Sequence, residues 1–138
     1  MAVPLEHVSY GTALNRDFQW SAYDFETTLE RLRQAMAEND LWLIDEINPQ
    51  VLLERGGFAI HPARQLFYFH PRYVARILAT DPAALVEIPL KFVVMQLPDG
   101  TVGVRSHPVE SLLGRYAKLS ALTDELAEIS RRLLAHIR

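Results

Sequence analysis

Cysteine is absent from this chain of 138 residues. Its absence excludes disulfides, zinc–thiolate sites and thiol nucleophiles together. A chain without disulfides fits a reducing compartment, and we expect a cytoplasmic protein. Long apolar runs are also absent, so no segment is predicted to cross a membrane. The sequence begins without the basic flank and apolar stretch that are typical of a secretory signal.

An excess of basic residues is missing as well. The chain holds 14 Lys and Arg against 17 Asp and Glu, a net charge of −3. Proteins that bind nucleic acids usually carry a basic face, so we expect no nucleic-acid partner. Apolar residues make up 49% and charged residues 22%, as in ordinary globular domains. We predict one domain over residues 16–138, preceded by an N-terminal arm at residues 1–15 that lacks clear periodicity.

A strand, a helix and a second strand are predicted at the start of this domain. Phe18 and Trp20 alternate with polar residues, which indicates a half-buried strand. Asp24 stands where a helix N-cap belongs. A second strand is predicted over residues 41–47. The helix between the strands has one apolar stripe, formed by Phe25, Leu29, Leu32 and Met36.

The rest of the chain continues this mixture of helices and strands. A short helix is predicted from Pro49 to the glycines at 56–57, a buried strand over residues 64–69, a helix from Pro71 and a loop over residues 81–89. Strands at residues 91–97 and 101–106 flank a Pro-Asp-Gly turn, a strong hairpin signature. A long C-terminal helix is predicted to pack on the sheet rather than in an intermolecular coil, with the stripe Leu119, Leu122, Leu126, Ile129 and Leu133.

The order of these elements is β-α-β-α-β-α-β-β-α. Such an order, with a closing hairpin, predicts an α+β fold: an antiparallel sheet with helices on one face.

Four segments, taken in order, carry a family resemblance. They are YDFETTLERLRQAMAENDLWLIDEIN (23–48), LLERGGF (52–58), QLFYFHPRYVARIL (65–78) and DPAALVEIPLKFVVMQLPDGTVGVRSHP (81–108). Together they resemble the bacterial and archaeal family known as domain of unknown function 302, over about residues 18–116.

The resemblance implies a single α+β domain of β-α-β(4)-α type. Its long C-terminal helix would lie across a curved antiparallel sheet, and the family often forms homodimers. The resemblance implies no established reaction and so no catalytic residues. Some branches of the family carry a cysteine before the turn that corresponds to Pro71 and another in the strand that corresponds to the residues after Pro89. Phe69 and His70, and Leu90 and Lys91, occupy these places here, so the resemblance carries no thiol chemistry to this chain.

Three of the five histidines, His61, His70 and His107, each precede a proline. Proline biases the residue before it toward extended backbone and suits the first turn of a helix. Each pair is therefore interpreted as a strand end that turns into the next element. The alternative is a three-histidine metal site, but the spacings match no compact ligand motif. We predict no metal and no cofactor.

A small anion site is the chemistry that the sequence favours most. Strand ends gather at one rim of a sheet, so His70 and His107 could share a rim with Lys91, Arg72 and Arg105. Arginine offers a forked donor to carboxylate or phosphate. Tyr68, from the strand that leads to His70, completes this candidate ligand-binding set. The alternative is that these cations only face water.

Aromatic residues in the predicted strands are interpreted as core residues. They are Trp20, Trp42, Phe67, Tyr68 and Phe69. In some sheets such residues stack on bases, but the acidic balance of this chain argues against that use.

Three functional hypotheses follow from the sequence. The leading one is a non-enzymatic domain that binds a small ligand or a partner, because a helix over a curved sheet can leave an apolar pocket. The second is a homodimeric structural or interaction protein without a ligand. The third is a metal- or anion-dependent enzyme centred on His70 and His107. We favour a protein without catalysis.

Overall fold

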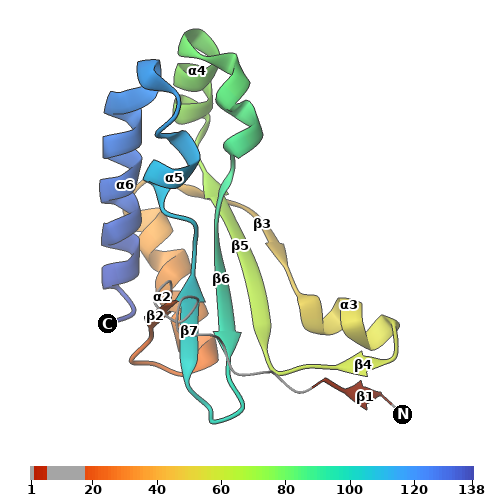
Figure 1. Ribbon diagram of the computed structural model, residues 1–138. Coiled ribbons are helices and arrows are strands. Elements are labelled where there is room, and N and C mark those ends of the chain that lie inside the picture. Colours follow the sequence, from red (N-terminus) through yellow and green to blue (C-terminus); the bar gives the residue numbers. More distant parts are fainter. Residues whose placement is uncertain (1, 6–17) are drawn as a thin grey trace.

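The computed structural model describes residues 2–5 and 18–138 and has the predicted α+β architecture. Most of the predicted N-terminal arm, residues 6–15, lies outside the described residues. Five strands form one antiparallel sheet (Figure 1), in the order β2 (Phe18–Trp20), β7 (Val102–Arg105), β6 (Leu90–Gln96), β5 (Ala63–Phe69) and β3 (Trp42–Ile47). A separate parallel pair joins β1 (Val3–Pro4) to β4 (Phe58–Ala59).

Two long helices cover one face of the sheet, α2 (Phe25–Glu38) and α6 (Ser120–Ala135). Both predicted apolar stripes are buried against the strands, which confirms that the C-terminal helix packs in the core. From the sheet, alternate residues such as Leu66, Phe92 and Val94 point into the same core. The N–H of Ala22 also donates to the carbonyl of Ile137 at 2.8 Å, so the segment after β2 is tied to the end of the last helix.

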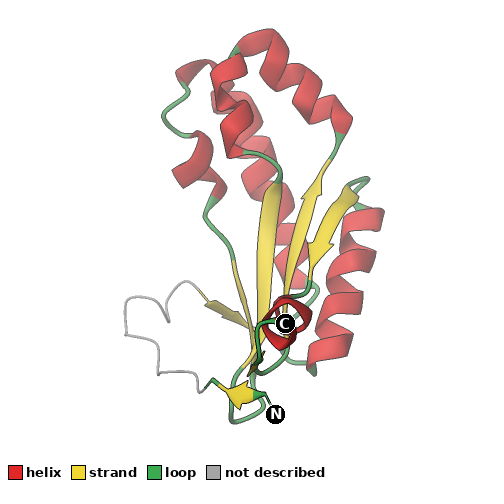
Figure 2. Cartoon of the chain, turned by 90° about the vertical axis from the view of Figure 1, so that its right-hand side faces the viewer, coloured by secondary structure: helices red, strands yellow, loops and turns green. Residues whose placement is uncertain are grey.

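The shorter helices lie around the sheet. α3 (Pro49–Arg55) begins at Asn48, whose side chain accepts from the N–H of Gln50, and it has no buried residue. α4 (Pro71–Thr80) and the 3₁₀ helix η1 (Pro82–Glu87) lie past one end of β5 and β6 (Figures 1 and 2). α5 (Val109–Leu113) and η2 (Ala117–Leu119) lead into α6. No helix in residues 2–5 and 18–138 is long and apolar enough to span a membrane.

Several local elements depart from the sequence-based prediction. Residues 81–89 were predicted as a loop, but most of them form η1, which Pro82 can open because the first turn of a helix needs no N–H. The short β1, β4, α5 and η2 were not predicted. Each has too few residues to show a hydrophobic period.

The prediction that both tryptophans pack in the core is wrong. Trp20 is 46% exposed and Trp42 is 54% exposed. The reason is the strand order, which places Trp20 in β2 and Trp42 in β3, the two edge strands of the sheet. An edge strand has a neighbour on one side only, so its large side chains are less completely covered. Tyr68 and Phe69, in the interior strand β5, are buried as predicted.

Gly103 provides a test of how β2 packs on β7. A β-carbon at Gly103 would lie 2.5 Å from a ring atom of Phe18 and 3.2 Å from Trp20. These two rings stack on each other with centroids 5.5 Å apart, so neither can move freely. We expect Gly103→Ala to lower the free energy of unfolding by about 1–3 kcal/mol in urea titrations, a typical cost of overpacking.

The matched control is Gly56→Ala. A β-carbon there would meet its nearest atom, the carbonyl oxygen of Leu53, at an ordinary 3.5 Å. Its effect should stay within about 0.5 kcal/mol. Equal stability of the two variants would show that the Phe18 ring is not held against β7.

Candidate functional site

The two arms of the hairpin differ in length, and this difference creates a gap in the sheet. β6 begins at Leu90, whereas β7 ends at Arg105, which pairs with Val93. The chain then leaves the sheet through Ser106 and His107. Pro108 has no N–H to donate to a ladder, so β7 cannot continue past it. The first residues of β6 therefore have a strand neighbour on the β5 side only.

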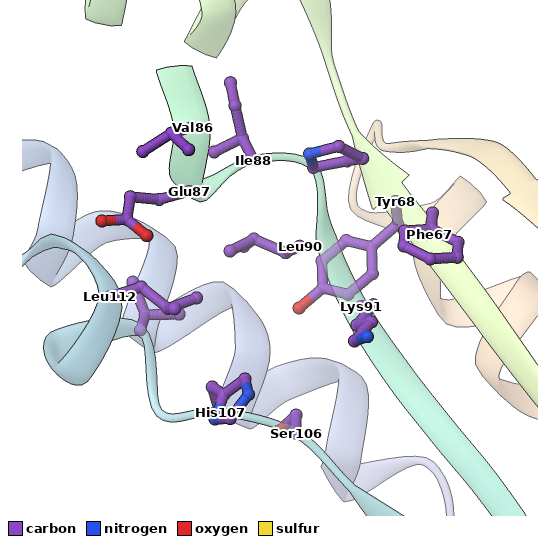
Figure 3. Close-up of a pocket in the computed structure, with 12 residues that line it drawn as sticks. Phe67, Tyr68, Val86, Glu87, Ile88, Leu90, Lys91, Ser106, His107 and Leu112 are labelled. Carbon is purple, nitrogen blue, oxygen red and sulfur yellow. The ribbon is translucent and has the colours of Figure 1, made fainter. Parts of the chain in front are cut away.

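A cavity of about 250 Å³ occupies this gap. Its apolar lining comes from both sides of the gap and from the end of η1 (Figure 3). Figure 3 shows His107 and Ser106 along one border, Val86 and Ile88 along the opposite one, and Leu90 between them. The other lining residues are Phe67, Tyr68, Glu87, Pro89, Lys91, Val109 and Leu112.

Lys91 is the β6 residue whose main-chain groups face the gap. Main-chain groups of successive strand residues face alternate neighbours. The N–H of Gln96 donates to Pro62 on the β5 side, and the N–H of Leu97 donates to Thr101 on the β7 side. Counting back by twos from Leu97 places the main-chain N–H and C=O of Lys91 on the β7 side. Since β7 has ended there, these groups face the gap beside Ser106 and His107.

The Lys91 side chain is also without a counter-ion. It is half-buried, and its ammonium lies 5.6 Å from the centre of the Phe67 ring. Within the part of the chain that the structure describes, no carboxylate lies at ion-pair distance from this ammonium. The cavity therefore has one positive group whose charge no described carboxylate compensates.

The carboxylate of Glu87, at the edge of the cavity, is bound through its Oε2. It accepts hydrogen bonds from the Arg115 guanidinium at 2.6 Å and from the Tyr116 hydroxyl at 2.8 Å. The pKa of Arg115 is raised, mainly by its hydrogen bond with the Tyr116 hydroxyl and next by its hydrogen bond with the Glu87 carboxylate. The negative charge of Glu87 is thus compensated from outside the cavity.

Tyr68 borders the cavity from within the core. Only 2% of its surface is exposed. Burial raises the pKa of the Tyr68 hydroxyl, and the hydrogen bond with Ser130 opposes this shift without cancelling it. The hydroxyl therefore stays neutral and can serve only as a neutral hydrogen-bonding group.

The structure brings three of the six predicted ligand-binding residues together. His107, Lys91 and Tyr68 line the cavity, whereas His70, Arg72 and Arg105 do not. Arg105 ends β7 opposite Val93.

His70 and Arg72 belong to the start of α4. The ring Nδ1 of His70 accepts from the N–H of Arg72 at 3.1 Å, so this histidine caps the helix. This geometry confirms the interpretation of His70 as a strand end that turns into a helix. The His70 ring also packs edge-on against Trp42, with the two ring centroids 5.0 Å apart. The Arg72 guanidinium is held by the main-chain and side-chain oxygens of Asp40.

The third histidine, His61, lies between β4 and β5. His70 and His107 line two different depressions of the surface. In residues 2–5 and 18–138, no group of three or more His, Asp or Glu side chains is placed to hold a metal ion.

Several lining residues were not predicted, notably Glu87, Ser106 and Leu112. A signal for them was present in the printed sequence. Eight residues separate the Pro-Asp-Gly turn from Pro89, but only seven separate it from Pro108, which has no N–H to donate to a strand ladder. Unequal arms indicate a gap beside the longer arm.

The raised pKa of Tyr68 predicts a loss of stability in alkali. Below about pH 10 the hydroxyl keeps its proton in both the folded and the unfolded chain, so it adds no pH dependence to the free energy of unfolding. Above that pH the unfolded chain loses the proton first, so the free energy of unfolding falls by up to about 1.4 kcal/mol per pH unit.

Urea titrations between pH 8 and pH 11 test this prediction, with Tyr68→Phe as the comparison. The variant lacks the titrating group, so above pH 10 its free energy of unfolding should rise relative to that of the wild type. Parallel pH profiles of the two proteins would contradict the assignment.

Comparisons with known proteins agree with the fold. The sequence matches the family described as Domain of unknown function DUF302 over residues 18–138. The structure is similar to the crystal structure of an uncharacterized conserved DUF302 protein from Bacillus stearothermophilus, with a TM-score of 0.71 and 23% identity over 87% of this chain and 93% of that one. A search of curated proteins gave no match. The family match extends the sequence resemblance past residue 116, and the chain belongs to the DUF302 family.

Proposed function

We propose that this chain is a small-ligand-binding domain and that its site is the cavity between β6 and the segment at residues 106–112. The observation that carries the proposal is a preformed hollow with apolar walls and a few polar groups at one border. This combination is typical of small-molecule sites.

The size of the cavity limits the ligand. Its volume of about 250 Å³ is just below the roughly 300–1,000 Å³ of sites for drug-sized molecules. The ligand is therefore a compact molecule, with room for one ring or a short branched chain against Ile88, Leu90 and Leu112.

Binding, rather than catalysis, is the activity that we propose. An activated serine needs a base within hydrogen-bond reach. Among the described lining residues, Ser106 makes no hydrogen bond with His107 and therefore lacks this activation.

A substitution that fills the cavity tests this proposal. Leu112 is half-buried and lines the cavity, so Leu112→Trp should occupy the ligand's volume. We expect a library of compact fragments to shift amide resonances of residues 86–91 and 106–112 in ¹H–¹⁵N NMR spectra. The variant should bind these fragments at least about tenfold more weakly than the wild type does.

The control variant is Leu85→Trp, which adds the same side chain at a position that is 44% exposed and outside the cavity. It should leave fragment affinity unchanged, and thermal melting verifies that both variants fold. The proposal fails if no fragment shifts these resonances, or if Leu112→Trp binds the fragments as the wild type does.

A second candidate function is self-association, which a different surface favours. β3 is an edge strand, and Trp42, Leu43 and Ile44 are 38–54% exposed along it. Trp42 and Ile44, with Val74 and Leu78 of α4, border an open apolar groove. An antiparallel edge strand can pair with its own copy about a two-fold axis, because the same residues then meet from both sides. We propose a homodimer through β3 as the alternative function.

Sedimentation equilibrium tests this alternative. The wild type should sediment as a dimer, and Ile44→Lys, which places a charge on the edge, should sediment as a monomer. Val86→Lys adds the same charge at a position that is 77% exposed and away from β3, so it should remain a dimer. A strictly monomeric wild type would rule out self-association.

A further inference from the structure

We infer that the ligand of the cavity is a small carboxylate with an apolar body, and that Lys91 holds the carboxylate with both its ammonium and its main-chain N–H. The inference rests on the proposed ligand-binding function and adds the chemical class of the ligand. It is carried by two features of the same residue, which the end of β7 exposes together.

The first feature is the uncompensated charge. In the described part of the chain, every other charged side chain that lines the cavity has a counter-ion, since Glu87 is paired with Arg115. Among the described residues, the interaction of the Lys91 ammonium is with the Phe67 ring alone. A half-buried ammonium beside apolar walls gains most from an anion that can displace water from it.

The second feature is the main-chain N–H of Lys91. Strand register aims it into the gap, and within residues 2–5 and 18–138 it has no hydrogen-bond partner. A carboxylate oxygen can accept from this N–H while the other oxygen meets the ammonium. Charge-assisted bonds of this kind are about twice as strong as neutral ones.

The remaining polar groups fit an anion at the same place. Figure 3 shows Ser106 and His107 on the border where the strand has ended, and both side chains can donate to an oxygen. The apolar residues Ile88, Leu90 and Leu112 lie farther from this border and suit the body of the ligand. Glu87 does not oppose the anion strongly, because Arg115 and Tyr116 bind its carboxylate.

A neutral amide is the competing ligand class. The C=O of Lys91 faces the gap together with the N–H, so a primary amide could bond both, as a neighbouring strand would. The ammonium decides between the two classes, because it attracts a carboxylate and gives an amide no comparable gain. Phenylacetate and phenylacetamide differ in this group alone and form a matched pair of probes.

The experiment is a titration of the full chain with each probe at pH 7, followed by ¹H–¹⁵N NMR. We expect phenylacetate to bind about tenfold more tightly than phenylacetamide and to shift the Lys91 amide proton downfield. Lys91→Met keeps the main-chain N–H and the apolar stem of the side chain. Lys91→Met should bind phenylacetate only as tightly as it binds phenylacetamide. Its affinity for phenylacetamide should equal that of the wild type.

Lys118→Met is the control, because Lys118 is exposed and does not line the cavity. It should leave both affinities unaltered, which separates a local contact from a general effect of net charge. Equal or tighter binding of phenylacetamide by the wild type would overturn the carboxylate assignment while leaving the cavity a ligand site. Failure of both probes also overturns the carboxylate assignment. The binding function itself is overturned separately, by the silence of the whole fragment library or by unchanged fragment binding in Leu112→Trp.

Discussion

The register of the β6–β7 hairpin is the constraint on which the candidate site depends. The turn fixes it: Gly100 has φ of +89°, a conformation that favours glycine, and the Asp99 carboxylate accepts from the N–H and hydroxyl of Thr101. Once the turn is set, the β7 partner of each residue in β6 is determined, and Lys91 lies beyond the last of these pairs, Val93 with Arg105. A shift by one residue would turn Phe92 and Val94 out of the core. The stability of the core and the geometry of the site are therefore fixed by the same pairing.

The two candidate surfaces follow from one sheet topology. β7 is shorter than its neighbour β6, which leaves a small hollow with polar groups at its border. β3 has no outer neighbour among the described residues, which leaves a wide apolar edge. The hollow matches a small molecule in shape, whereas the open edge matches only another extended surface. This difference in shape is why the two proposals involve different surfaces and can both hold.

Much of the fold could be predicted from the sequence because its signals are local. The stripes of α2 and α6, the cap at Asp24 and the turn at residues 98–100 each depend on a few neighbouring residues. The exposure of Trp20 and Trp42 could not be predicted, because it depends on which strands lie at the edges of the sheet. The sequence predicted part of the site, because some of its residues have local signals and others do not. Lys91, His107 and Tyr68 stand near predicted strand ends, but the contribution of Glu87 and Leu112 depends on how η1 and α5 pack. The separation of His70 from His107 likewise depends on the strand order, which periodicity does not reveal.

The bond between Ala22 and Ile137 has a consequence for how the chain is made. During synthesis β2 emerges long before β7, its strand partner in the described sheet, and before the carbonyl of Ile137 to which the next segment is bonded. Until those residues arrive, Phe18 and Trp20 lack the β7 backbone on which they pack, and an exposed aromatic segment of this kind is prone to wrong contacts. Closing so long a loop is also slow, since most of the chain must be ordered before the contact forms. β2, the first of the five sheet strands to be synthesised, is thus among the last parts of that sheet to be completed.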